Sequence, residues 1–271
     1  MGSRLASTAR GRFGPVAAIG AVLLTSAVVA GCGVDVPSTG TSASPAAAAA
    51  KVPLGSGPAD ALQAQYEDVI KAVLPSVVQI STPDATGSGV VFDRKGDIVT
   101  NAHVVGSAST VQVTSDVSGA MLTAKVVGVF RPDDVAVIRV TSGAGSLRPA
   151  NFGQSADVSA GQIVLALGNP LGLTGSATQG IISATGRTLI ETDATAGGAT
   201  KTTTIADTLQ TSAAINGGNS GGALVSLTGQ VIGMPTAAGV DAGGGDATGI
   251  GFAIPSDTVT SIAGQLISAG G

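Results

Sequence analysis

The sequence predicts an all-β protein. From Ser76 onward, about a dozen apolar runs of strand length follow one another, separated by turn signals. No helical segment of ten residues lies between them, which argues against a parallel α/β sheet. The 41 glycines and the aromatic content of only 2% are typical of short strands joined by tight turns. We therefore expect antiparallel sheets that close into barrels or pack as a sandwich.

The chain is large enough to bury a substantial core, and its charge argues against one class of partner. It has 271 residues, a formal net charge of -4 and a pI near 4.8. It contains neither a Lys/Arg run nor an aromatic stacking platform, the two features with which proteins hold a phosphate backbone. We expect no nucleic-acid partner.

Residues 1–31 have the layout of an export signal. Arg4, Arg10 and Arg12 precede the uncharged run PVAAIGAVLLTSAVVAG, which ends at Cys32, the single cysteine of the chain. The letters VAGC resemble the lipobox of bacterial lipoproteins, in which the cysteine becomes the lipidated first residue. This predicts a lipoprotein on the outer face of the cell membrane, with an uncleaved single-pass anchor or a secreted protein as alternatives. All three interpretations place the following domain outside the cytoplasm, where it folds without disulfides.

A tether and a helix are predicted to come before the strands. Residues 32–57 are rich in Ala, Pro, Ser and Thr and too poor in large apolar groups to bury a core, so we expect a flexible tether. Apolar residues then recur at helical spacing from Leu62 to Val73. Pro58 suits the first turn of this helix and Pro75 marks its end.

The strands follow in order along the rest of the chain. The predicted runs are VVQIS, GVVFD, DIVTNAHVV, TVQVTS, AKVVGVF, VAVIRV, QIVLALG, TQGIISAT, TTTIADTLQTSAAI, GALVSL, QVIGMP and GIGFAI. Pro235 removes a ladder donor, so residues 236–238 are expected to be irregular. A final helix is predicted in SDTVTSIAGQLIS, with Ser256 or Asp257 as its cap.

The stretch INGGNSGGALV, residues 215–225, places four glycines around Ser220. Glycine weakens packed structure, so such a cluster indicates that backbone must approach another group closely. A tight turn here offers the serine hydroxyl together with the N–H groups of Gly218 and Ser220. Two such donors can stabilise the oxyanion of an acyl-transfer reaction.

A serine nucleophile needs a general base, and the chain has one histidine, His103 in TNAHVV. A carboxylate on the other ring nitrogen would fix the tautomer, and the candidates are Asp133 and Asp134 in RPDDVAVIRV. The serine window also fits the G-x-S-x-G elbow of α/β-hydrolases, but in that fold the histidine follows the serine. The order His103, Asp134, Ser220 instead matches the chymotrypsin-like arrangement.

Five segments together carry a family resemblance. TNAHVV, DDVAVIRV, ALGNPLGL, LQTSAAINGGNSGGALV and GIGFAIP, in this order, resemble the protease domain of the HtrA/DegP family of trypsin-like serine proteases. The resemblance begins at about Leu62 and implies a domain over 58–271. It implies two six-stranded antiparallel β-barrels of the chymotrypsin type, at about 58–150 and 151–271, with short N- and C-terminal helices.

The resemblance also implies roles for individual residues. His103 becomes the general base, Asp134 its orienting carboxylate and Ser220 the nucleophile, with Gly218, Asn219 and Ser220 in the oxyanion hole. Asp134 is preferred because the family's acid directly precedes the apolar strand, and Asp133 is the fallback. Asn219 stands where zymogen-type relatives have an aspartate that pairs with a newly cut N-terminus. Activation by such a cut is therefore not expected.

The substrate pocket is expected to be apolar. In trypsin an acidic residue six positions before the nucleophile selects Lys or Arg, and here Ala214 has that spacing. We expect cleavage after small or aliphatic residues. The residues expected to bind substrate are Leu209, Ala214, Ile215, Thr236, Ala237 and Ala238.

Together these features predict an extracytoplasmic serine endopeptidase that cleaves unfolded or exposed polypeptides through an acyl-enzyme, in envelope protein quality control. No PDZ domain of the kind common in the family is expected, and a homotrimer is an assembly that the resemblance allows. No cofactor or metal is expected, because Asp241 and Asp246 lack the ligand density of a calcium loop. The alternative is a catalytically silent lipoprotein that binds extended peptides on the same fold.

Overall fold

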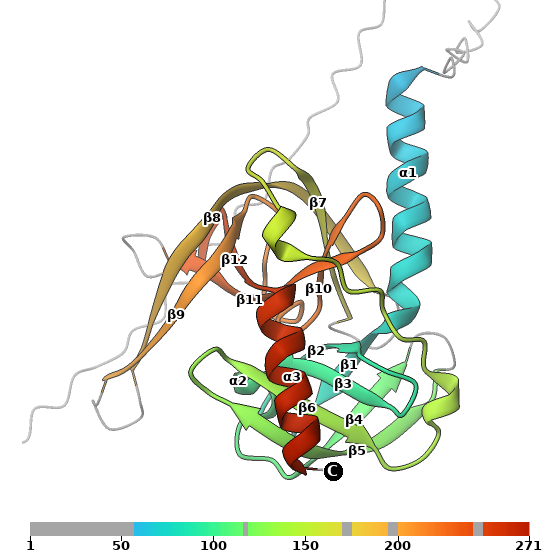
Figure 1. Cartoon of the computed structure of the whole chain (residues 1–271), viewed down its shortest axis with the longest axis vertical. Coiled ribbons are helices and arrows are strands. Elements are labelled where there is room, and N and C mark those ends of the chain that lie inside the picture. Colours follow the sequence, from blue (N-terminus) through green and yellow to red (C-terminus); the bar gives the residue numbers. More distant parts are fainter. Residues whose placement is uncertain (1–56, 116–118, 170–174, 195–199, 241–245, 271) are drawn as a thin grey trace, which may run out of the picture. The chain divides into compact units, whose positions relative to one another are not determined.

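The computed structural model describes residues 57–115, 119–169, 175–194, 200–240 and 246–270. The predicted signal peptide, Cys32, the tether up to residue 56 and Asp241 lie outside these ranges. Twelve described strands form two antiparallel sheets of six, and each sheet closes into a barrel (Figure 1). The predicted fold class is confirmed, and barrels rather than a sandwich are formed.

The first barrel holds the neighbours β1-β2-β3-β6-β5-β4 in a closed ring. Its strands are β1 (Val77–Ser81), β2 (Thr86–Val91), β3 (Asp97–Asn101), β4 (Thr110–Ser115), β5 (Met121–Phe130) and β6 (Val135–Val140). Alternation decides which side chains face inward: in β4, Val111 and Val113 are buried while Thr110 and Gln112 are exposed. The interior is filled mostly by valine and isoleucine, which suit a pleated, half-buried surface.

The second barrel closes in the order β10-β11-β12-β9-β8-β7. Its strands are β7 (Ile163–Gly168), β8 (Ser176–Ala194), β9 (Thr200–Thr211), β10 (Ala223–Ser226), β11 (Val231–Val240) and β12 (Asp246–Pro255). Its interior holds a separate apolar cluster that includes Leu209, Ile215 and Ile232.

A third apolar cluster joins the two barrels and the terminal helices. Helix α1 (Pro58–Val73) has the predicted bounds and buries Val69 and Val73 in this cluster. Helix α3 (Ser256–Gly270) contributes Val259 to the cluster, while its Leu266 packs against β5 of the first barrel. Helix α3 thus contacts both barrels, although the expected boundaries group it with the second. Within the described ranges, no helix combines the length and apolar character needed to cross a bilayer.

Two local expectations were wrong. The run DIVTNAHVV is not one strand: it divides into β3 and the short helix α2 (Ala102–Val105), whose first N–H donates to the carbonyl of Asp134 at 3.1 Å. The side chains of Ser256 and Asp257 do not serve as the expected helix cap. The Ser256 hydroxyl donates to the Gly153 carbonyl, and the Asp257 carboxylate accepts from Ser155 in the turn η3 (Ser155–Asp157). At the start of this helix, both side chains therefore bond to residues distant in the sequence and not to the N–H groups of the first helical turn.

A partly buried ion pair joins the two strands next to the predicted catalytic His103 and Asp134. Asp97 on β3 and Arg139 on β6 are direct cross-strand partners, and the Asp97 side chain is fully buried. The arginine donates from Nε at 2.6 Å and from Nη2 at 3.0 Å, one bond to each carboxylate oxygen. The side-chain hydrogen bond to Asp97 raises the pKa of Arg139 above its ordinary value. This pair adds a side-chain link to the backbone pairing of β3 with β6.

Candidate active site

His103 and Asp134 lie together at the end of the first barrel. His103 is on α2, directly after β3, and Asp134 directly precedes β6, the neighbour of β3. The His103 Nδ1 atom is 2.7 Å from Asp134 Oδ2, and the His103 backbone N–H donates to Asp134 Oδ1 at 2.9 Å. One carboxylate therefore orients both the ring and the backbone of the histidine. Because Nδ1 faces Asp134, Nε2 lies on the opposite side of the ring.

The backbone of Asp134 is held in an uncommon conformation. Its φ is +52°, in the left-handed region that few residues other than glycine adopt. Its carbonyl accepts from the Ala102 N–H and from Nδ2 of the fully buried Asn101, at 3.1 and 3.0 Å. Asp134 is only 6% exposed, whereas Asp133 is half-buried, and the described hydrogen bonds connect Asp134, not Asp133, with His103. The geometry favours the preferred acid over the fallback.

Thr236 connects the acid with the serine. Its hydroxyl donates to Asp134 Oδ2 at 2.6 Å, and its carbonyl accepts from the Ser220 hydroxyl at 3.2 Å. The irregularity expected near Pro235 is confirmed: the pairing of β11 with β12 shifts register between Pro235 and Ala237, around Thr236. Thr236 was expected to bind substrate, and the structure shows in addition that its hydroxyl is a partner of the acid. Pro235 predicted the irregular pairing of this strand, but nothing in the sequence indicated the contact of Thr236 with Asp134.

The glycines around Ser220 allow the turn to touch the first barrel. Gly221 has a φ of +79°, and a Cβ there would collide with the Ser88 carbonyl oxygen and with Thr100 Oγ1. Its N–H donates to the Pro235 carbonyl at 2.9 Å. The Ser88 N–H donates to the Ser220 carbonyl, also at 2.9 Å. The close approach predicted from the sequence is therefore between this turn and strand β2.

Asn219 stabilises the turn from within, while two N–H groups stay available. Its Oδ1 accepts from the Asn216 N–H at 3.0 Å, and its Nδ2 donates to the carbonyl of the exposed Ala214 at 3.1 Å. Among the described residues, no acceptor receives the N–H of Gly218 or of Ser220. Both groups remain donors for an oxyanion. The Asn219 N–H, which was also placed in the oxyanion hole, donates instead to the Asn216 carbonyl at 3.2 Å.

The remaining expected substrate residues have different surroundings. Leu209 is 2% exposed and packs in the core of the second barrel, so it has almost no surface to offer a substrate. Ile215 is 5% exposed and occupies the space next to Gly251 where a larger residue would place its side chain. Ala237 and Ala238 are half-buried on β11, opposite β12.

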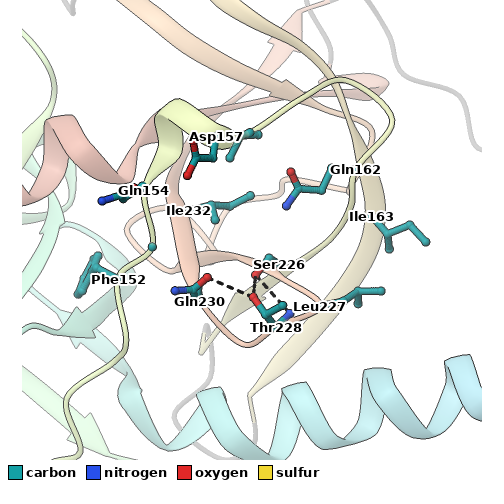
Figure 2. Close-up of a pocket in the computed structure, with 12 residues that line it drawn as sticks. Phe152, Gln154, Asp157, Gln162, Ile163, Ser226, Leu227, Thr228, Gln230 and Ile232 are labelled. Atoms are coloured by element: carbon teal, nitrogen blue, oxygen red, sulfur yellow. Dashed lines mark hydrogen bonds between the residues drawn. The ribbon is translucent and has the colours of Figure 1, made fainter.

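A cavity of about 590 Å³ lies elsewhere on the second barrel (Figure 2). Polar side chains such as Asp157, Gln162 and Gln230 surround it, with the Ser226–Thr228 hydrogen bond at its edge. Its lining includes none of the predicted site residues. The arrangement of His103, Asp134 and Ser220 is therefore a separate site.

Two six-stranded barrels, with a His–Asp pair on the first and a serine in a glycine-rich turn on the second, define the chymotrypsin-like class of serine proteases. Residues 87–234 match the family described as trypsin-like peptidase domain. The chain belongs to this family, and its relatives are of the HtrA type.

Similar proteins include Serine protease PepD of Mycobacterium tuberculosis, 40% identical over 248 residues, which are 84% of this chain and 50% of that protein. A probable periplasmic serine endoprotease DegP-like of Chlamydia trachomatis is 41% identical over 68% of this chain and 34% of its own length. The solved HtrA-type protease AlgW with tripeptide superposes with a TM-score of 0.65 at 35% identity, covering 76% of this chain and 64% of that one. The chain thus spans half or less of these two curated relatives.

Proposed function

We propose that this protein is a serine endopeptidase that acts outside the cytoplasm on unfolded or exposed polypeptides. The observation that carries the proposal is the 2.7 Å contact between His103 Nδ1 and Asp134 Oδ2. The same carboxylate oxygen is connected to Ser220 through Thr236. Asp134, His103 and Ser220 are the acid, the base and the nucleophile that the chymotrypsin mechanism requires.

The proposed chemistry follows from these positions. The Ser220 hydroxyl turns from the Thr236 carbonyl, loses its proton to His103 Nε2 and attacks the peptide carbonyl carbon. Asp134 stabilises the imidazolium that forms, and the N–H groups of Gly218 and Ser220 hold the oxyanion. The imidazolium then protonates the leaving amine, which leaves an acyl-enzyme. Water, deprotonated by the same histidine, releases the acid product and restores Ser220.

The comparisons support the substrate class and the location. The AlgW structure was solved with a tripeptide, and the Chlamydia relative is described as periplasmic. With the export signal at 1–31, we infer that this domain is attached to the outer face of the membrane through a lipid on Cys32 and acts in envelope quality control. A homotrimer is the assembly that we propose from the family resemblance.

Fluorophosphonate labelling tests the proposal directly. The probe reacts with an activated serine, so we expect a single modification of the folded protein, mapped by mass spectrometry to Ser220. Protein unfolded in urea before the probe is added provides the control and should stay unlabelled. If the folded protein also stays unlabelled while it binds extended peptides, the silent peptide-binding lipoprotein is the better description.

We also propose that the pocket accepts small or aliphatic side chains before the cleaved bond. Ile215 and Gly251 lie against each other, and Ala214 replaces the acid that would attract Lys or Arg. In an apolar pocket, one methylene changes discrimination by about 10- to 200-fold. We therefore propose that the space between Ile215 and Gly251 sets which side chain is accepted before the cleaved bond.

Ile215→Ala should shift this preference toward larger residues. We expect the ratio of kcat/KM for Phe over Val substrates to rise at least about tenfold, because the truncated side chain leaves room next to Gly251. Chromogenic peptides that differ at this one residue provide the measurement. Ile232→Ala is the matched control, because Ile232 is buried in the same core cluster but lines the separate cavity. An unchanged ratio in the Ile215 variant would show that this side chain does not shape the pocket.

A further inference from the structure

A serine of the first barrel reaches into the turn that carries the nucleophile. Ser88 lies on β2 and is fully buried. Its hydroxyl donates to the Gly218 carbonyl at 2.5 Å and accepts from the Asn169 N–H, at the end of β7, at 2.8 Å. We propose that Ser88 is a positioning residue that holds the oxyanion turn in its catalytic conformation. This inference rests on the proposed function.

The bonded peptide unit lies between the two proposed oxyanion donors. The Gly218 carbonyl and the Asn219 N–H belong to one planar peptide group. Ser88 holds its carbonyl end, and the Asn216 carbonyl receives its N–H at 3.2 Å. The Gly218 N–H comes from the preceding peptide group and the Ser220 N–H from the following one. Fixing the central group therefore limits how both donors can rotate.

Gly218 cannot hold this conformation by itself. Its φ is +110°, and glycine moves readily among regions that other residues avoid. A rotation at Gly218 would turn a donor N–H away from the oxyanion position. An external contact must oppose that rotation, and the Ser88 hydroxyl makes one directly on the Gly218 carbonyl.

Ser88 itself is held firmly enough to do this. Its N–H donates to the Ser220 carbonyl at 2.9 Å, and its carbonyl accepts from the Thr100 hydroxyl at 2.7 Å. A serine hydroxyl has one proton, and the Asn169 N–H occupies a lone pair on the same oxygen. The Ser88 hydroxyl proton therefore points to the Gly218 carbonyl oxygen. The first barrel thus supplies the proposed base and also braces the oxyanion turn of the second.

The test compares Ser88→Ala with Ser256→Ala. Ser256 is also fully buried, and its hydroxyl also donates to a glycine carbonyl, that of Gly153 at 2.7 Å. Loss of one oxyanion donor reduces turnover about 10²- to 10³-fold, so loosening both should lower the kcat of Ser88→Ala at least about tenfold. We expect KM to stay unchanged, and backbone hydrogen exchange across residues 216–220 to accelerate. Ser256→Ala should keep the wild-type kcat and the wild-type exchange in this turn.

Each other outcome is decisive. A folded Ser88→Ala protein with wild-type kcat and wild-type exchange overturns the inference, as does an equal fall of kcat in Ser256→Ala. If Ser88→Ala does not fold, Ser88→Thr, which keeps the hydroxyl, takes over the test. Wild-type kcat together with wild-type exchange in the threonine variant supports the inference, and a folded threonine variant with lowered kcat but wild-type exchange overturns it. If the wild-type protein neither cleaves nor labels, the proposed function fails, while the exchange comparison still decides the role of Ser88 in the turn.

Discussion

Ser220→Ala is expected to lower kcat by about 10⁶-fold, the size of the effect when a serine protease loses its nucleophile. The alanine cannot form the acyl-enzyme, and the remaining rate comes from substrate binding and the oxyanion donors alone. Initial rates on casein and on a chromogenic peptide measure the effect. A difference of this size is measurable only if the preparation contains no other protease. Titration of the wild-type protein with a serine-protease inhibitor tests this, because the number of active sites should match the protein concentration.

A second serine serves as the control for Ser220. Ser226 is buried in the same barrel, at the end of β10, where its hydroxyl is bonded to that of Thr228. Ser226→Ala removes the same atom from a serine that lines the separate cavity, and it should leave kcat unchanged. Comparable rates for the wild type and the Ser220 variant would remove Ser220 from the mechanism.

Asp134→Asn is expected to reduce kcat by about 10⁴-fold, as loss of the acid does in the chymotrypsin mechanism. Asparagine tolerates the left-handed backbone that Asp134 adopts, so the substitution changes the charge while it preserves the conformation. Its side-chain N–H₂ group can face Nδ1 of His103 and favour the wrong ring tautomer. The loss should appear in kcat measured with saturating peptide near neutral pH.

Asp133→Asn is the matched control for the acid. Asp133 is adjacent in the chain and half-buried, but the described contact with His103 is made by Asp134. The control should retain wild-type kcat. If Asp133→Asn instead caused the larger loss, the roles of the two aspartates would be exchanged.

The sequence predicted the parts of the site that depend on residue type and chain order. A single histidine, an acid directly before an apolar strand and a serine among glycines are rare together, and their order distinguishes two folds. Asn101 and Ser88, and the contact of Thr236 with the acid, escaped detection because hydroxyl and amide side chains are common in strands. Their contacts join residues far apart in the chain, such as Ser88 with Gly218, and no local pattern encodes such a pair.

The fold shows the same division between local and tertiary signals. Helix α1 was predicted to its last residue because apolar spacing and two prolines define it locally. The short α2 was missed because its four residues continue an apolar run, and their conformation depends on contacts with the segment around Asp134. Likewise, Ser256 and Asp257 are typical capping residues, yet their partners lie about a hundred residues away.

Helix α3 makes the precision of catalysis depend on a part of the chain that bears no reactive group. The proposed base and nucleophile belong to different barrels, so their spacing is set by how the barrels are joined. Helix α3 packs on both, with Val259 in the shared cluster and Leu266 on β5. By packing on both barrels, these two side chains restrain how the barrels lie against each other, and with this the spacing of the proposed base and nucleophile.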